Sequence, residues 1–459
     1  LIHRLVNAKK LSLVQVNPDI AGRSYQTEAI RRITDGLSLK SRRHLLVMAT
    51  GTGKTRTAIA LVDLLKRADW VKRVLFLADR NALLTQAKRA FKEHLPSAMT
   101  VDITEDRSGT NATVVLSTYP TMMNRIDDVQ DGEKPFGVGH FDLVIVDEAH
   151  RSIYQKYRAL FEYFDALLVG LTATPRDELH RDTYRIFGLE KGVPTFAYEL
   201  SDAVEDGYLV APRGVSAPFK FLQQGVKYKD LTEEEKEEYE AKLVDAETGE
   251  LPDHVSAAAL NKWLFNEDTV DKALELLMER GLTVHDGDRL GKTIVFGRNH
   301  KHAEFIVERF DKAYTHLAGK FARVIDSHND YAQTLLDEFS EADKNPHIAV
   351  SVDMLDTGVD VPECLNLVFF KPVRSRVKFN QMIGRGTRLC PNLFGQDEDK
   401  TCFLVFDLCS NFEFFGQDLA AVPHVGAGVS GIGHDGPLSL GNVVWPRGEP
   451  AAPAPVNAL

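Results

Sequence analysis

Residues 49–55 combine the residue types that bind the phosphates of a nucleotide. The stretch reads Ala-Thr-Gly-Thr-Gly-Lys-Thr, follows the apolar run 45–47 and leads into a helical pattern. In such a strand–loop–helix unit the glycines let backbone N–H groups converge on the phosphates, Lys54 reaches the β and γ oxygens, and the Thr55 hydroxyl ligates Mg²⁺. Met48 replaces the first glycine of the usual pattern, so only the second half of that pattern is literal. We expect a nucleoside triphosphate to bind at Thr50, Gly51, Thr52, Gly53, Lys54 and Thr55.

Two adjacent carboxylates, Asp147 and Glu148, follow the apolar run 143–146. A buried parallel strand that ends in these residues delivers them beside the phosphate loop of the same sheet. There Asp147 would hold Mg²⁺ through water, and Glu148 would polarise the attacking water as a base. Acidic residues are also common at solvated strand ends, but the phosphate loop earlier in the chain makes that alternative the weaker one.

Five short motifs, in this order, resemble the motif series of superfamily 2 helicases and translocases: 50–55, 147–150 (a DEAH box), 172–174, 356–360 and 381–388. The longer strings 76–81, 117–123, 147–154 and 369–375 resemble the motor region of the restriction subunit of type I restriction-modification enzymes. The resemblance runs from about residue 23 to about residue 415. It implies an α/β fold with two tandem RecA-like parallel-sheet lobes and a helical insertion between them.

In this resemblance the second lobe completes the nucleotide site. The pattern Gln-x-x-Gly-Arg-x-x-Arg supplies Gln381, Arg385 and Arg388, which would close over the γ-phosphate. Arginines that stabilise the transition-state charge accelerate hydrolysis by ~10³–10⁵, so hydrolysis would be tied to closure. A basic helix start that pairs with surface acids is the weaker alternative. Gly358 and Asp360, in the turn after an apolar run, would touch the ribose and the arginine helix.

Gln26 lies in a segment, Arg-Ser-Tyr-Gln-Thr, that resembles the adenine-recognition segment of this superfamily. Its amide offers one acceptor and a donor pair, which matches the N6/N7 edge of adenine. The alternative is a polar residue early in an amphipathic helix. We therefore expect ATP and Mg²⁺ as cofactors.

Loops that follow the expected strands supply the residues expected to contact DNA. Small hydroxyls, amides and arginines suit contacts to the phosphodiester backbone, although Ser, Thr and Asn also cap helices. The expected contacts are Arg80, Asn81, Ser117, Thr118, Arg298 and Thr357. His300 and His302 have no third and fourth metal ligand nearby in the sequence, so we expect an exposed helix start there rather than a ligand pair.

Composition is consistent with a large cytoplasmic enzyme. The chain has 459 residues, 44% of them hydrophobic, and a formal net charge of −11. Much of the acidity lies in 230–240, which reads as one solvated helix, so a DNA groove elsewhere can be neutral or basic. The four cysteines show no C-x-x-C pairing and are expected to be reduced core thiols. No apolar stretch approaches the ~18 residues of a membrane span.

Short β-branched runs alternate with helical stretches, which predicts βαβ units and parallel sheets. We expect strands in the first half at 45–48, 74–77, 114–116, 143–146 and 167–171, and in the second half at 293–296, 322–325, 348–350, 367–370 and 403–406. The expected organisation is an N-terminal segment 1–22, lobe 1 at 23–212, a helical insertion at 213–290, lobe 2 at 291–415, and a Gly-, Pro- and Ala-rich tail at 416–459.

The resemblance implies a DNA-dependent ATPase that translocates double-stranded DNA as the motor part of a type I restriction subunit. Its partners would be double-stranded DNA and the modification (methyltransferase) and specificity subunits. No room for the family's nuclease domain is seen before Arg23, so we expect the chain to move DNA without cutting it. The alternatives are a strand-separating DNA or RNA helicase, and a nucleotide-gated DNA-binding scaffold with vestigial ATPase motifs.

Overall fold

The computed structural model describes residues 8–106, 111–128, 134–149, 151–176, 179, 181–216, 266–285, 287–326, 328–329, 331–356, 360–373, 375–409 and 411–415. Most of the expected insertion 213–290, the expected tail 416–459, and the site residues Thr357 and Gly358 lie outside these ranges. The chain folds into two compact units. The first comprises Leu1–Val210, Met354–Asp360 and Ser375–Leu389, and the second comprises Ala211–Asp353, Val361–Arg374 and Cys390–Leu459.

The first unit is built on a seven-stranded sheet in the order β3-β4-β2-β5-β6-β1-β7. All of its strand pairs are parallel. The strands are β1 (Arg43–Met48), β2 (Val74–Ala78), β3 (Thr100–Asp102), β4 (Val114–Thr118), β5 (Leu143–Val146), β6 (Leu167–Thr172) and β7 (Phe196–Tyr198). The five runs expected in this half are all strands, and the short edge strands β3 and β7 are additions to them.

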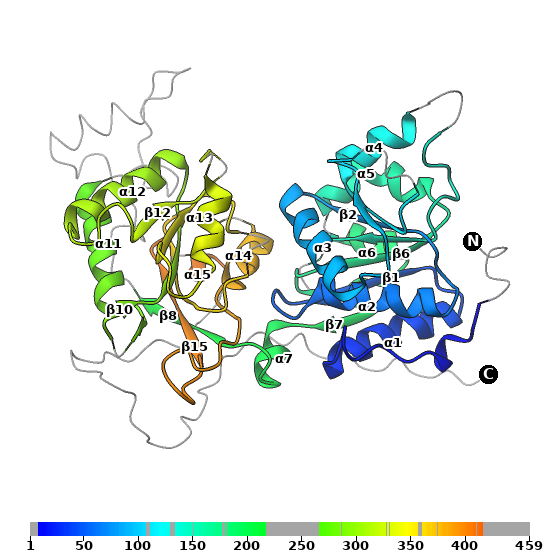
Figure 1. Ribbon diagram of the computed structural model, residues 1–459, viewed down its shortest axis with the longest axis horizontal. Helices are drawn as coiled ribbons and strands as arrows, with labels where there is room; N and C mark the ends of the chain where they lie inside the picture. Colours follow the sequence, from blue (N-terminus) through cyan, green and yellow to red (C-terminus); the bar gives the residue numbers. More distant parts are fainter. Residues whose placement is uncertain are drawn as a thin grey trace. The chain divides into compact units, whose positions relative to one another are not determined.

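Helices cover both faces of this sheet (Figure 1). They are α1 (Ser24–Ser38), α2 (Lys54–Arg67), α3 (Asn81–His94), α4 (Tyr119–Asp127), α5 (Arg151–Tyr163), α6 (Arg181–Phe187) and α7 (Leu200–Glu205), with a 3-10 turn at Leu11–Leu13. Alternate residues of β1 enter opposite cores: Leu46 packs in the core that includes α1 to α3, whereas Leu45 packs in the core that includes α4 to α6. Burial on both faces explains why the strands read as continuous apolar runs.

The second unit has a parallel six-stranded sheet in the order β12-β13-β11-β14-β15-β8. Its strands are β8 (Ala211–Ser216), β11 (Lys292–Phe296), β12 (Ala322–Val324), β13 (Ile348–Ser351), β14 (Cys364–Phe369) and β15 (Cys402–Asp407), and a small antiparallel pair is formed by β9 (Thr283–Val284) and β10 (Arg289–Leu290). The five expected runs of this half are again strands. β8, which crosses the expected boundary at residue 212, pairs with β15.

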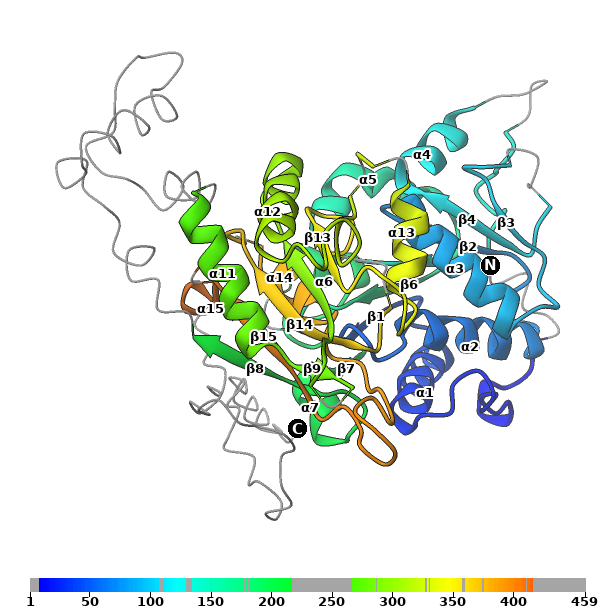
Figure 2. The ribbon, with the colours of Figure 1, turned by 60° about the vertical axis from the view of Figure 1, so that its left-hand side comes forward.

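The helices of the second half are α11 (Glu267–Arg280), α12 (His300–Ala313), α13 (Ala332–Phe339), α14 (Arg376–Ile383) and α15 (Asn411–Phe414). α11 packs against α12 (Figure 2), and Arg309 of α12 forms ion pairs with Glu267 and Asp271 of α11. α14 belongs to the first unit. All four cysteines are free thiols, of which Cys364 is buried.

Candidate nucleotide-hydrolysis site

Two glycines in the left-handed region shape the loop between β1 and α2. Gly51 and Gly53 have φ values of 100° and 84°, which residues with a Cβ avoid. A Cβ on Gly53 would also lie 2.7 Å from Gln26 Nε2. α2 begins at Lys54, so its free N–H groups and the positive end of its dipole face this loop. The loop therefore has the backbone that a phosphate cradle requires.

Residues of α1 hold this loop from one side. The Tyr25 hydroxyl donates to the carbonyl oxygen of Thr52 at 2.8 Å, and Gln26 Nε2 donates to the same oxygen at 3.1 Å. The other end of the Gln26 amide, Oε1, accepts from the backbone N–H of Arg23 at 3.4 Å. Tyr25 in turn stacks on Tyr198, with ring centroids 3.9 Å apart. Gln26 thus supports the loop, and its contact with adenine stays a prediction.

The two carboxylates stand at the carboxyl end of β5. Asp147 and Glu148 are 8% and 9% exposed. The Tyr119 hydroxyl donates to the carbonyl oxygen of Asp147 at 2.7 Å, and the backbone N–H of Glu148 donates to Asp147 Oδ1 at 3.1 Å. Glu148 has a φ of 53°, and its Oε2 is buried without a hydrogen-bond partner in the structure. Strained backbone and an unpaired acceptor are features of sites organised for function.

A single strand, β6, separates these carboxylates from the phosphate loop, because it pairs with β5 on one side and with β1 on the other. The backbone N–H of Ala149 donates to the carbonyl oxygen of Leu171 in β6 at 2.9 Å. Thr172 and Thr174, at the end of β6, are buried, and the N–H of Thr174 donates to the Thr172 hydroxyl at 3.1 Å. The sheet order therefore brings the three motifs to one edge, as expected for ligand sites of parallel sheets.

Lys54 and the carboxylates influence one another through charge. Burial lowers the pKa of Lys54, and the negative charges of Glu148 and Asp147 oppose this shift. Burial and the neighbouring Glu148 raise the pKa of Asp147 to about 7, while Lys54 acts in the opposite direction. The Lys54 ammonium donates to the carbonyl oxygen of Met48 at 3.3 Å. The site thus holds a cation and two carboxylates in a buried place, where charges act strongly.

The segment Ser375–Leu389, which belongs to the first unit, brings the expected arginines to the phosphate loop. A Cβ on Gly51 would lie 2.4 Å from Arg388 Nη1, and a Cβ on Gly384 would lie 2.5 Å from Thr50 Cβ. Arg388 Nε donates to Asp360 Oδ1. Gln381 and Arg385 are 6% and 9% exposed, and Arg385 Nε donates to the Gln381 carbonyl oxygen at 3.1 Å.

Burial and the charge of Arg388 lower the pKa of Arg385 to about 10. The carboxylates of Asp360, Asp356 and Glu148 act in the opposite direction. Arg385 therefore remains a buried cation at neutral pH, within the electrostatic reach of the base that the sequence predicts.

A cavity of about 380 Å³ opens beside the loop. It is lined by Pro18, Gly22, Arg23, Gln26, Gly51, Gly53, Arg56, Asp360 and Arg388. A volume in this range suits a nucleotide-sized ligand. The residues also fit Mg²⁺, because the Thr55 hydroxyl and the Asp147 carboxylate are hard oxygen donors and the Glu148 Oε2 atom has a free acceptor position.

Two family models match parts of this chain. Residues 19–177 match the family model described as type III restriction enzyme, res subunit, and residues 271–390 match the helicase conserved C-terminal domain. The chain therefore carries the two domains that these models describe, in this order along the sequence.

Relatives of this chain include endonuclease subunits of type I restriction enzymes from Escherichia coli. The identity is 32% with the EcoKI subunit, over 84% of this chain and 34% of the relative, and 29% with the EcoAI subunit, over 86% and 47%. A solved fragment of an HsdR subunit assigned to a type I restriction enzyme from Vibrio vulnificus is 27% identical, with a TM-score of 0.62, over 88% of this chain and 67% of that one. The chain thus spans less than half the length of these two curated relatives.

The residues expected to contact DNA lie at the carboxyl ends of strands in both units. Arg80 and Asn81 stand at the start of α3, after β2, and Arg298 follows β11. Ser117 is fully buried, and its hydroxyl donates to the carbonyl oxygen of Thr118. The Thr118 hydroxyl accepts from the backbone N–H of Thr121 at 3.3 Å and caps α4. The capping alternative therefore describes Thr118, and the DNA contacts of all these residues stay predictions.

The expectation for His300 and His302 needs correction. His300 does begin α12, but His302 is fully buried rather than exposed. His300 also has neighbours that could ligate a metal: Asp326 and His328, distant in sequence, place possible ligand atoms within 4.8 Å of it and of each other. Sequence spacing missed this group because the loops that follow two different strands of one sheet bring it together.

Among the described residues, no helix is both long enough and apolar enough to cross a membrane.

Proposed function

We propose that this chain is an ATP-dependent double-stranded DNA translocase and the motor part of a type I restriction subunit. The observation that carries the proposal is the environment of Glu148: a buried carboxylate with an unpaired oxygen, beside Asp147 and within the electrostatic reach of Lys54 and Arg385. A strained, buried and unpaired acid has no evident benefit for folding, and it is suited to polarise a water molecule.

In this proposal each side chain has one task. Lys54 and the loop N–H groups bind the β and γ oxygens of ATP, and Glu148 accepts a proton from the attacking water. Mg²⁺, held by Thr55 and Asp147, would neutralise phosphate charge when bound. Arg385 and Arg388 stabilise the charge that develops on the transferred phosphoryl group, which is worth ~10³–10⁵ in rate. The Tyr119 hydroxyl positions Asp147 by donating a hydrogen bond to the backbone carbonyl oxygen of Asp147.

Double-stranded DNA and the modification and specificity subunits are the proposed partners. The names of the two Escherichia coli relatives and the similarity to the Vibrio vulnificus fragment support this assignment. Arg80, Asn81 and Arg298 are the proposed contacts to the DNA backbone, because they lie at strand ends where loops can follow a polynucleotide. Such contacts position the duplex without reading its sequence.

The test measures steady-state ATP hydrolysis by the purified chain on duplexes of increasing length. A translocase that starts internally and leaves at the ends hydrolyses faster on longer duplexes, whereas a scaffold that binds DNA locally saturates with the number of sites. Lys54→Ala is expected to abolish the DNA-stimulated rate. Arg385→Ala is expected to lower kcat by ~10³ with a much smaller change in ATP affinity.

Displacement of a third strand from a triplex distinguishes translocation from strand separation. The wild-type chain is expected to displace the third strand and to leave a blunt duplex paired, whereas Arg385→Ala is expected to fail in displacement. Ready unwinding of the blunt duplex would favour the helicase alternative. Normal hydrolysis by Arg385→Ala would refute the assigned active site.

A further inference from the structure

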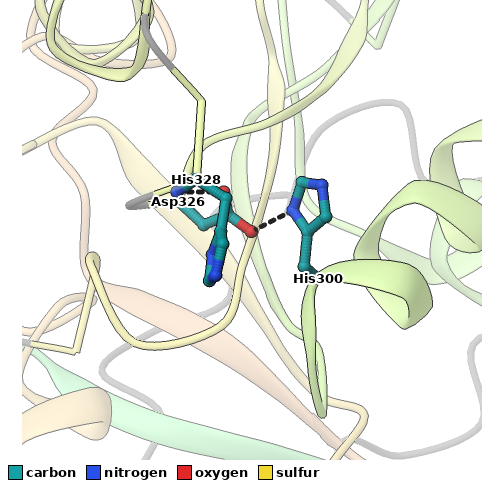
Figure 3. Close-up of side chains that lie close together, drawn as sticks. All are labelled: His300, Asp326 and His328. Carbon is teal, nitrogen blue, oxygen red and sulfur yellow. Dashed lines mark hydrogen bonds and ion pairs between the residues drawn. The ribbon is translucent and has the colours of Figure 1, made fainter.

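A second cluster of chemically competent side chains lies in the second unit, apart from the residues assigned to ATP. His300, Asp326 and His328 each offer one ligand atom, and these atoms lie within 4.8 Å of one another. Figure 3 shows the two imidazoles on either side of one Asp326 carboxylate oxygen. His300 Nδ1 lies 2.7 Å from Asp326 Oδ2, and the ring centroids of the two histidines are 5.1 Å apart.

The fold positions each member of this cluster from the backbone. Asn299 caps α12 by accepting from the backbone N–H of His302 at 2.9 Å, which places His300 at the first helical position after β11. Asp326 follows β12 by two residues, and its Oδ1 accepts from the backbone N–H of His328 at 3.1 Å. Asn329 Nδ2 donates to the carbonyl oxygen of Val324 at 3.1 Å and closes the same loop.

The carboxylate at the centre is buried, and one histidine is open to solvent. The side chain of Asp326 has 0% exposure, whereas that of His300 is 33% exposed and His328 is an exposed residue. A buried carboxylate requires a cationic partner or a metal ion. The exposed His328 imidazole can turn toward the carboxylate without repacking the core, and it leaves a solvent-facing side for a further ligand.

The other nitrogen of His300 has the kind of partner that a metal-binding histidine uses. His300 Nδ1 faces the cluster, while Nε2 lies 3.3 Å from Oε1 of Glu304, one turn along α12. Histidines that bind a metal through one nitrogen almost always donate the other N–H to a carboxylate, carbonyl group or water, which fixes the orientation of the ring. The Asp326–His300–Glu304 arrangement has this form.

We propose that His300, Asp326 and His328 bind a divalent transition metal ion of the zinc type. Two imidazole nitrogens and one carboxylate oxygen form a donor set that such ions prefer over Mg²⁺. Bonds of about 2.1 Å in a tetrahedral site separate the ligand atoms by about 3.4 Å. His300 Nδ1 and Asp326 Oδ2, now 2.7 Å apart, would therefore part slightly to admit the ion, and His328 would complete the site from within 4.8 Å. Water would take the fourth position. The ion would link the start of α12 to the loop after β12, close in sequence to Arg298.

The test titrates the full chain, freed of metal by chelation and without nucleotide or Mg²⁺, with Zn²⁺ by calorimetry and with Co²⁺ by visible absorption. The wild type is expected to bind one equivalent at this site and to show the intense visible bands of tetrahedral Co²⁺. His300→Ala/His328→Ala is expected to lose that equivalent and those bands, while His316→Ala, which removes an exposed histidine elsewhere, keeps both. Glu304→Gln is expected to weaken Zn²⁺ binding by ~10–100-fold.

The variants act at partly or fully exposed imidazoles, so folding is expected to persist, and circular dichroism of each variant checks this. Equal Zn²⁺ binding by the wild type and the double variant would overturn the proposal. So would loss of the tetrahedral Co²⁺ spectrum in Asp147→Asn rather than in the double variant, because the ion would then belong to the nucleotide site.

Discussion

Replacing Glu148 with Gln should make the protein more stable and nearly inactive. Glu148 is buried beside Asp147, and Oε2 of Glu148 has no hydrogen-bond partner in the structure. Its charge is the second cause, after burial, of the rise in the pKa of Asp147 from 3.8 to about 7. That difference corresponds to about 4 kcal/mol. Burial, the larger cause, persists when the Glu148 charge is removed, so we take about 1–2 kcal/mol as the part that is relieved.

Lys54 decides whether this gain is realised. The negative charges of Glu148 and, after it, Asp147 both stabilise the Lys54 ammonium, and Asp147 remains as its negative partner when the charge of Glu148 is gone. We therefore expect Glu148→Gln to raise the free energy of unfolding by about 1–2 kcal/mol. The same change removes the base and is expected to lower DNA-stimulated hydrolysis by ~10²–10⁴. Stability would be gained where function is lost, as is common at active sites.

Urea denaturation followed by circular dichroism, in EDTA and without nucleotide, measures the first effect, and steady-state ATP hydrolysis measures the second. Glu205→Gln is the matched control, because Glu205 is exposed at the end of α7. It is expected to change the free energy of unfolding by less than about 0.5 kcal/mol and to leave turnover unchanged. A less stable Glu148→Gln variant would show that Lys54 depends on Glu148 for folding. Near-wild-type turnover would refute the assigned base.

Two further predictions concern packing and pH. Gly384→Ala fits the backbone, but its Cβ would lie 2.5 Å from Thr50 Cβ. The arginine segment would have to shift by ~1 Å, which is expected to lower kcat by ~10². Gly137→Ala, whose Cβ would have nothing within 4 Å, should keep the wild-type kcat, and equal rates for the two variants would contradict this account. Burial lowers the pKa of His347 from 6.5 to about 4, so the unfolded state binds the proton first. The free energy of unfolding therefore falls as the pH decreases from 6.5 toward 4. Urea unfolding at stepped pH should show a shallower fall of this free energy in His347→Gln than in the wild type, and identical slopes would exclude the assignment.

The strand, loop and helix that hold the proposed phosphate-binding residues were predictable because these residues are contiguous. Gly53, Lys54 and Thr55 sit between an apolar run and a helical pattern, so local backbone preferences alone indicate the strand, loop and helix. The strands of both sheets were predictable for a related reason. Parallel strands buried on both faces must be apolar at nearly every position, and this requirement is written in the local sequence.

Contacts between segments distant in the sequence could not be predicted in this way. No local pattern indicates that β6 lies between β1 and β5, although that order sets the distance from the phosphate loop to Glu148. The role of Tyr119, whose hydroxyl holds the Asp147 carbonyl oxygen, likewise depends on two segments that meet only in the folded sheet. The grouping of Ser375–Leu389 with the first unit is a third case.

The sequence by itself determined the α/β class and the strand runs, and it predicts Lys54, Asp147 and Glu148 as chemically active groups. Only the tertiary structure decided that Tyr119 holds the Asp147 carbonyl oxygen, that Gln26 supports the phosphate loop, and that His300 meets Asp326. The physical reason is the range of the forces involved. Helix and strand patterns arise from hydrogen bonds and burial among near neighbours, whereas sheet order and side-chain meetings depend on how the whole chain packs into a core.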